Sequence, residues 1–181
     1  AVVAGIPAFV LIQWIAPVVS EFPEMASTFY FARTVTGAPM ALMNMVSSNI
    51  NQWTLLIAML PVVFSISAGG PASIPLDAEQ QLELLMTIGQ ALLAMLFLVN
   101  MELAWWEAAL LFAVWLAQFV LSVVPSAGPG LLSLLARENR PYITGLYFVL
   151  SGFELLRMFL GRRKPQAFHA FAAIWRRHVR P

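Results

Sequence analysis

Residues 14–24 read Trp-Ile-Ala-Pro-Val-Val-Ser-Glu-Phe-Pro-Glu, and they place two carboxylates, Glu21 and Glu24, inside an otherwise apolar tract from about Gly5 to Ala32. The tract exceeds the roughly 20 residues that one membrane-spanning helix requires. Pro23 lacks a backbone N–H and disturbs helical hydrogen bonding, so we predict a helix that is interrupted near its two acids. Because an ionisable side chain at membrane depth is costly and usually faces a cavity or a partner, this interruption is a candidate functional site.

The overall composition supports a membrane protein and excludes an ordinary soluble domain. Hydrophobic residues make up 60% of the 181-residue chain and charged residues only 10%, whereas a soluble domain carries roughly 25% charged residues. The chain contains no cysteine, which excludes a disulfide or a thiolate metal site. Seven of the ten Lys and Arg residues lie from Arg157 onward. The solvent of this chain is therefore a lipid bilayer, and its basic end is a tail.

Four further apolar tracts follow the first, with short breaks between them. They run from about Met40 to Ser67, Leu82 to Met101, Leu103 to Val124 and Tyr142 to Leu160. Asp77 and Gln80 have the spacing of a capping box and mark the start of the third helix. A break rich in Pro and Gly at residues 125–130 precedes the last tract. The sequence thus predicts an all-α polytopic membrane protein with about five transmembrane helices, the first two of them interrupted.

The distribution of charge predicts how the chain is oriented in the membrane. Lys and Arg near span ends mark the cytoplasmic side, so the cluster at residues 157–164 puts the end of the fifth span and the C-terminal tail inside. Five spans then place the start of the chain outside, together with the acidic group Asp77, Glu79 and Glu83. Arg137 and Arg140, with Glu138 between them, are exceptions to this pattern, because they fall on the outer side.

Residues 161–181 are predicted to form a basic cytoplasmic tail. Phe171 and Trp175 fall at helical spacing opposite Arg176 and Arg177, a pattern that suits a short amphipathic helix on the anionic inner leaflet. A solvated tail is the alternative. Basic residues beside a span fit lipid headgroups better than nucleic acid, so we expect the lipid bilayer as a partner and no nucleic acid.

Two smaller charged features lie near the ends of the later spans. Glu102 and Glu107 flank a pair of tryptophans at the start of the fourth tract, where aromatic belts meet headgroups, and they are interpreted as interfacial anchors. Glu154 and Arg157 are three residues apart in the fifth tract and are expected to form a structural pair.

The second tract carries a polar face that complements the acids of the first tract. Its residues at i, i+3, i+4, i+7 and i+8 are Asn44, Ser47, Ser48, Asn51 and Gln52. Asn49 is offset from this face, and in the first tract Ser20 lies one helical turn before Glu24. Two interpretations remain open, because these polar residues either bind a cation or join helices by hydrogen bonds, as Ser and Asn commonly do in membranes.

With these motifs, the first 67 residues resemble one alpha repeat of the sodium/calcium exchanger superfamily of cation antiporters. Those repeats pair a Gly-Thr-Ser-x-Pro-Glu type motif on one broken helix with a Gly-Asn-x-x-Gly-Ser-Asn-Ile type motif on the next. Here residues 20–24 read Ser-Glu-Phe-Pro-Glu and residues 44–50 read Asn-Met-Val-Ser-Ser-Asn-Ile. The resemblance implies a transporter of two inverted repeats, with residues 1–67 as an ion-binding broken helix pair and residues 68–160 as three closing transmembrane helices.

The resemblance also implies a set of metal ligands. Glu24 matches the family's ion-binding glutamate, whereas Glu21 stands where the family usually has Ser. Ser47 replaces a Gly, and Gln52 stands where an Asn or Asp ligand commonly follows. Because two close carboxylates do not both ionise readily, the extra acid favours a proton-coupled or sodium-coupled exchanger over a strictly calcium-selective one. The implied ligands are Glu24, Glu21, Ser20, Asn44, Ser47, Ser48, Asn49 and Gln52.

A second Pro-Glu motif does not follow Glu24 in the sequence. We therefore predict that the chain is the C-terminal half of a secondary cation antiporter that works by alternating access, and that its partner is the missing N-terminal half. Ca2+, Na+ or H+ would be the transported cations, and no cofactor is expected. The sequence has no glycine-rich phosphate loop and no Ser/His/Asp order, so an enzyme is not expected.

Two alternatives belong to other functional classes. One is a non-transporting membrane scaffold or assembly subunit that uses its polar helix faces only for packing. The other is an intramembrane hydrolase that uses Glu21 and Glu24, but neither a nucleophile nor a histidine or metal ligand set accompanies these acids.

Overall fold

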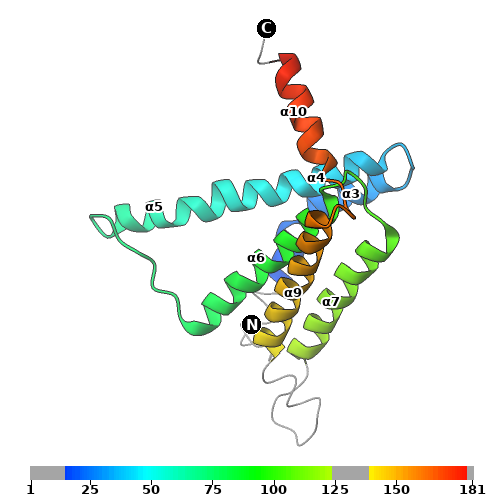
Figure 1. The fold of residues 1–181 in the computed structure, drawn as a ribbon. Coiled ribbons are helices and arrows are strands. Elements are labelled where there is room, and N and C mark those ends of the chain that lie inside the picture. Colours follow the sequence, from blue (N-terminus) through cyan, green and yellow to red (C-terminus); the bar gives the residue numbers. More distant parts are fainter. Residues whose placement is uncertain (1–14, 124–138, 179–181) are drawn as a thin grey trace, which may run out of the picture. The chain divides into compact units, whose positions relative to one another are not determined.

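The computed structural model describes residues 15–123 and 139–178, and all regular structure in these ranges is helical (Figure 1). The all-α prediction is therefore confirmed. The start of the first apolar tract, residues 5–14, and the predicted break at residues 125–130 lie outside the described residues. The chain divides into two compact units, Ala1–Pro75 and Leu76–Pro181, which we describe one after the other.

In the first unit, the first apolar tract forms two helices that are interrupted at Glu21. These are α2 (Ala16–Ser20) and α3 (Phe22–Ala32). Glu21 has φ −97° and ψ 5°, outside the helical region. Pro23 lies in the first turn of α3, where the N–H that it lacks would have no partner within that helix. The amide of Glu21 still donates to the carbonyl of Pro17 at 2.9 Å, so the interruption is a local irregularity and not an unwound segment.

The second apolar tract is continuous through 30 residues, and its interruption is a π-helical turn. The tract contains α4 (Ala38–Asn51), the π turn η3 (Gln52–Ile57) and α5 (Ala58–Ser67). Pro61 lies four residues after the end of the π turn and cannot donate the backbone hydrogen bond that the Ile57 carbonyl accepts in a regular α-helix. π-helical turns are rare and are frequently found at functional sites.

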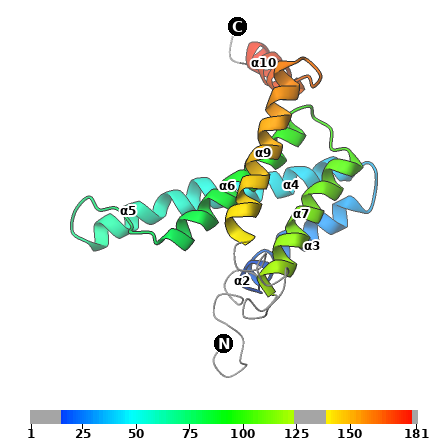
Figure 2. The same ribbon diagram turned by 60° about the horizontal axis from the view of Figure 1, so that its bottom comes forward.

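Helices α3 and α4 form an antiparallel hairpin (Figures 1 and 2). A tight turn joins them, and Gly37 is required there because a Cβ atom at this position would lie 2.3 Å from the Phe31 carbonyl oxygen. Among the described residues of this unit only the small residue Ala41 is buried, and large apolar side chains cover the outer faces of the helices. Such a surface suits contact with lipid or with further helices.

In the second unit, α6 (Ala78–Leu98) packs along α9 (Asn139–Phe159), and α7 (Trp105–Val123) packs against α9. Gly89 lets α6 and α9 approach closely, because a Cβ atom there would lie 3.0 Å from the Cβ of Tyr147. The capping box predicted for the start of α6 is confirmed, since Asp77 and Gln80 exchange hydrogen bonds between side chain and backbone. The buried apolar core consists of Met86, Leu93, Phe97, Val114, Ile143 and Tyr147.

Three described helices are long and apolar enough to cross a membrane, namely Ala38–Ser67, Ala78–Leu98 and Trp105–Ser122. This agrees with a polytopic membrane protein. Helix α9 has 21 residues, which is sufficient for a span, but it carries three charged residues, Arg140, Glu154 and Arg157. After α9, α10 (Gln166–His178) forms a helix in the predicted tail, with Phe171 and Trp175 exposed.

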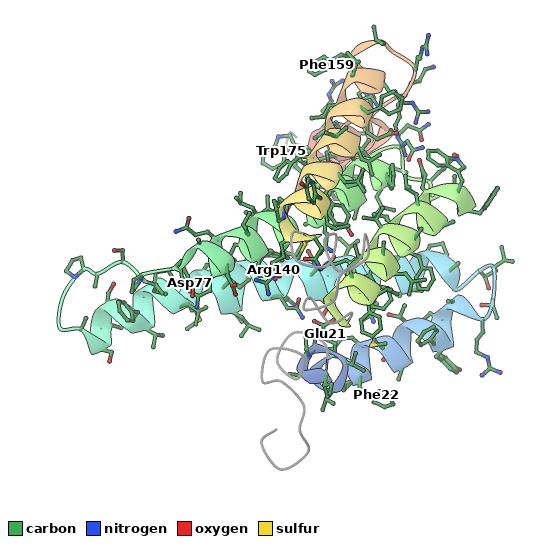
Figure 3. The ribbon with its side chains drawn as sticks, turned by 90° about the horizontal axis from the view of Figure 1, so that it is seen from below. Glu21, Phe22, Asp77, Arg140, Phe159 and Trp175 are labelled. Carbon is green, nitrogen blue, oxygen red and sulfur yellow. The ribbon has the colours of Figure 1, made fainter. Side chains whose placement is uncertain are left out.

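Helix α9 carries a polar stripe that faces the interior of the second unit, namely Arg140, Thr144, Tyr147, Ser151 and Glu154. Figure 3 labels Arg140 and Phe159 at opposite ends of this helix. Arg140 forms ion pairs with Glu79 at 3.0 Å and with Glu83 at 2.9 Å. The one described arginine that conflicts with the predicted orientation is thus paired with the acids of the predicted outer side.

At the other end of this stripe lies a set of charges, buried except for Arg157, that we call the Arg163 ion cluster, consisting of Arg163, Glu107, Glu154 and Arg157. Arg163 pairs with Glu107 at 2.6 Å and with Glu154 at 2.8 Å, and its side chain is only 5% exposed. The predicted pair of Glu154 and Arg157 is confirmed at 2.7 Å. Glu107, which was expected to be an interfacial anchor, is buried, and its carboxylate pairs with Arg163.

Candidate functional site

The hairpin of the first unit contains a polar groove with a volume of about 510 Å³. The interruption at Glu21 and the polar face of α4 both contribute to it, and Figure 3 labels Glu21 and Phe22 at the start of α3. The residues that line the groove are Ser20, Glu21, Glu24, Asn44, Ser47, Ser48, Asn51, Gln52, Leu55 and Leu56. The structure therefore brings together seven of the eight ligands implied by the family resemblance.

Glu24 is the carboxylate whose surroundings most clearly leave room for a ligand. It lies in the first turn of α3, directly after Pro23. Its oxygen Oε2 is buried and accepts no hydrogen bond from any other residue in the described ranges. A buried carboxylate oxygen normally has a hydrogen-bond or charge partner. Glu24 therefore offers an unused acceptor within the groove.

Glu21 is held by a contact between the two helices. Its oxygen Oε1 accepts a short hydrogen bond from Nε2 of Gln52. Gln52 is the first residue of the π turn, so the irregular backbone of the second tract positions the side chain that meets the interruption of the first tract. The interruption at Glu21 and the π turn at Gln52 thus meet in the same wall of the groove. The sequence offered one signal for the π turn, which is Pro61.

Asn44 ties the two helices of the hairpin together. Its Nδ2 donates to the backbone carbonyl of Glu24 at 3.1 Å and to the hydroxyl of Thr28 at 2.9 Å. This is the helix-joining role that Asn commonly has in membranes, and it fixes the backbone directly at Glu24. Ser20 behaves differently, because its hydroxyl donates to the carbonyl of Pro17 in the preceding turn at 3.1 Å.

Ser47 and Ser48 distinguish between the two interpretations of the polar face, which are cation binding and the joining of helices. Both line the groove, but neither side chain makes a hydrogen bond to another residue within 15–123 or 139–178. Their hydroxyls are therefore not used to join the described helices and remain available to a ligand in the groove. Asn51 lines the groove as well, as its place on the predicted polar face indicates, although the family resemblance did not include it.

Asn49 is the one implied ligand that does not line the groove. Its side chain is exposed, on a different face of α4 from Ser48. This placement follows from the helical repeat, because Asn49 is about 100° away from its neighbours around the helix axis. A contact between Asn49 and an ion would require a different arrangement from the one seen in the hairpin alone.

The chemistry of the groove suits a hard cation. Within the described ranges no three His, Cys, Asp or Glu side chains come together, so the groove offers two carboxylates supplemented by neutral hydroxyl and amide oxygens. Oxygen-only sites are typical of Ca2+ and related hard cations, whereas zinc sites use sulfur or imidazole ligands. Leu55 and Leu56 give the groove an apolar border.

Comparison with known proteins places the chain in a wider context. Residues 1–124 match the family described as sodium/calcium exchanger protein. The fold is similar to the crystal structure of the H+/Ca2+ exchanger CAX, with a TM-score of 0.73 and 35% sequence identity over 96% of this chain. The chain spans 40% of the length of that protein's chain. No curated protein sequence matches the chain significantly.

Proposed function

Because the chain belongs to the sodium/calcium exchanger protein family, we propose that it forms one half of a secondary active cation antiporter. The observation that carries this proposal is the buried, unpartnered Oε2 of Glu24 in a polar groove whose outer surroundings are apolar. A carboxylate in such a place is stabilised when a cation or a proton neutralises it. The groove would thus be the place where transported ions bind.

In this proposal Ca2+, Na+ and H+ compete for the two carboxylates. Glu24 is the central ligand, and Glu21 is a second acid that tunes it while Gln52 holds it in place. Neutral oxygens from Ser20, Asn44, Ser47, Ser48 and Asn51 complete this side of the site. The site would open to each side of the membrane in turn, with the C-terminal tail on the cytoplasmic side.

The proposal that a second half completes the site rests on the open groove and on the length of the relative. A hard cation prefers about six oxygen ligands, and one helix hairpin supplies them from one side only. The apolar outer faces of α4 and α5 are exposed, and the chain spans 40% of the CAX chain. In inverted-repeat transporters the helices of both repeats meet at the ion site.

The first prediction tests whether the site is complete. The monomeric 181-residue chain in detergent should bind Ca2+ or Na+ only weakly, with a Kd above about 1 mM, because too few oxygens reach the ion. Isothermal titration calorimetry measures this. The same titration on the complete transporter should show saturable binding that Glu24→Gln removes. Tight binding to the demonstrably monomeric chain would instead mean that the site is complete within it.

The second prediction concerns Glu21. In the complete transporter, Glu21→Ser should leave cation flux active but alter its pH or ion dependence, because the substitution removes one of the two carboxylates that line the groove. Flux into vesicles, measured across a series of pH values, tests this. Glu21→Asp keeps the second acid and should keep the wild-type pH and ion dependence. An unchanged profile for Glu21→Ser would show that Glu21 is not part of the ion site.

A further inference from the structure

The end of α9 is shaped by a glycine turn that returns the chain toward the second unit. Gly161 has φ +70°, a left-handed conformation that favours glycine. Its amide donates to the Met158 carbonyl, and the amide of Arg162 donates to the Arg157 carbonyl, both at 3.0 Å. This is the hydrogen-bond pattern of a Schellman motif. The residues that follow Gly161 are thereby directed back toward the end of α9.

The returning segment is fastened to the loop between α6 and α7. Nη2 of Arg163 donates to the Phe97 carbonyl at 2.5 Å and to Oδ1 of Asn100 at 3.3 Å. The amide of Ala167, at the start of α10, donates to the Val99 carbonyl at 2.9 Å. Together with the Arg163 ion cluster, these contacts form the walls of a pocket with a volume of about 410 Å³. The pocket is therefore built from fixed elements.

The pocket carries an excess of positive charge. Four basic residues line it, namely Arg157, Arg162, Arg163 and Lys164. Two carboxylates, Glu107 and Glu154, neutralise Arg163 and Arg157. Arg162 and Lys164 are exposed and form no ion pair with any residue of the described ranges. Nε of Arg163 is buried and donates no hydrogen bond to a described residue. The pocket thus presents unused donors and two unpaired cations.

The neighbouring side chains indicate where this pocket lies relative to a bilayer. Trp106 lines it, and tryptophan is enriched at the depth of the lipid headgroups. Phe159 and Leu160 directly precede the glycine turn, and Phe168 follows on α10, and all three are exposed. Apolar side chains beside a cationic pocket match the two parts of a phospholipid, which are acyl chains and a phosphate group.

We propose that this pocket binds the phosphate of an anionic phospholipid headgroup at the membrane surface. The phosphate oxygens accept hydrogen bonds from Arg162 and Lys164, and the acyl chains contact Phe159, Leu160 and Phe168. Basic pockets at the ends of transmembrane helices recognise such headgroups. Free inorganic phosphate lacks the acyl chains that these apolar side chains would cover, so the lipid is the occupant that fits the whole surface.

Lipid binding to the full chain in micelles of an uncharged detergent tests the proposal. Native mass spectrometry, with phosphatidylglycerol titrated against phosphatidylcholine, gives the Kd of each lipid. We expect each chain to bind one phosphatidylglycerol molecule about tenfold tighter than it binds phosphatidylcholine. The double variant Arg162→Gln with Lys164→Gln should lose about thirtyfold in phosphatidylglycerol affinity, since each basic residue near a lipid phosphate contributes roughly fivefold.

The matched control removes two charges from the same tail outside the pocket. Arg176→Gln with Arg177→Gln should weaken binding by less than about threefold, because uncharged micelles have no surface potential for these residues to sense. Both double variants change exposed side chains, so both should melt at the temperature of the wild-type protein. A melting curve of each variant checks that it is folded. Lys164→Gln alone provides a milder variant, which should lose about fivefold.

Three outcomes would overturn the proposal. The first is an equal loss of affinity in the two double variants, which would mean diffuse charge attraction without a site. The second is equal binding of the charged and zwitterionic lipids. The third is displacement of phosphatidylglycerol by millimolar inorganic phosphate, which would identify a soluble anion as the occupant.

Discussion

Glu24→Gln is expected to abolish cation-driven flux in vesicles that contain the complete transporter, lowering the rate about 100-fold or more. Glutamine keeps the size of the side chain and the capacity of the groove for hydrogen bonding, but it removes the charge that would neutralise a bound cation. Oε2 of Glu24 has no hydrogen-bond partner among the described residues, so the substitution breaks no contact that holds the hairpin together. The loss should therefore concern transport and not folding.

The control for this prediction is Glu102→Gln, which removes the same charge from an exposed side chain of the second unit. This variant should transport at the wild-type rate. Both proteins should show the same melting temperature and the same expression level. If Glu24→Gln transports at the wild-type rate, the assignment of Glu24 as the central ligand is wrong, and the groove has only a structural role.

Arg163→Met is expected to destabilise the second unit strongly. The substitution keeps most of the length of the side chain but leaves the carboxylates of Glu107 and Glu154 buried with one cation fewer. Removing one partner of a buried ion pair costs about 3–5 kcal/mol, which corresponds to a decrease in Tm of roughly 10 °C for a chain of this size. Thermal unfolding in detergent, followed by circular dichroism, measures the change.

A double-mutant cycle separates the charge from the packing. Glu107→Gln alone should destabilise the protein, but in the Arg163→Met background the same change should raise Tm, because it removes the uncompensated buried charge. Lys164→Met, at the exposed neighbour of Arg163, should change Tm by less than about 2 °C. If Arg163→Met and Lys164→Met melt at the same temperature, the ion cluster does not contribute to stability.

Local patterns in the sequence were sufficient to predict most of the helices. The apolar tracts, the capping box at Asp77 and the pair of Glu154 and Arg157 depend on residues at most a few positions apart, and all of them are present. Arg163 could not be assigned in this way. Its partner Glu107 lies on another helix far away in the sequence, and a run of three basic residues after a span looks the same whether one of them turns inward or all face water.

The candidate site was predictable to the extent that it follows helical periodicity. The 3.6-residue repeat correctly grouped Asn44, Ser47 and Ser48 on one face with Asn51 and Gln52. It could not indicate which of these side chains would join helices and which would stay unbonded, because that depends on the partner across the hairpin. That Asn44 joins the helices is visible only from its hydrogen bonds to Thr28 and to the backbone carbonyl of Glu24.

The polar stripe of α9 has a consequence for how the protein is made. A segment with Arg140, Glu154 and Arg157 partitions less readily into a bilayer by itself, because each charge in a span disfavours insertion, by about 3 kcal/mol at the helix centre and by less toward its ends. Arg140 is neutralised by two acids of α6, and Glu154 pairs with Arg157 in the same helix and with Arg163 in the segment after it. During synthesis α9 therefore depends on α6 remaining close to the insertion machinery, and it enters the lipid together with that helix.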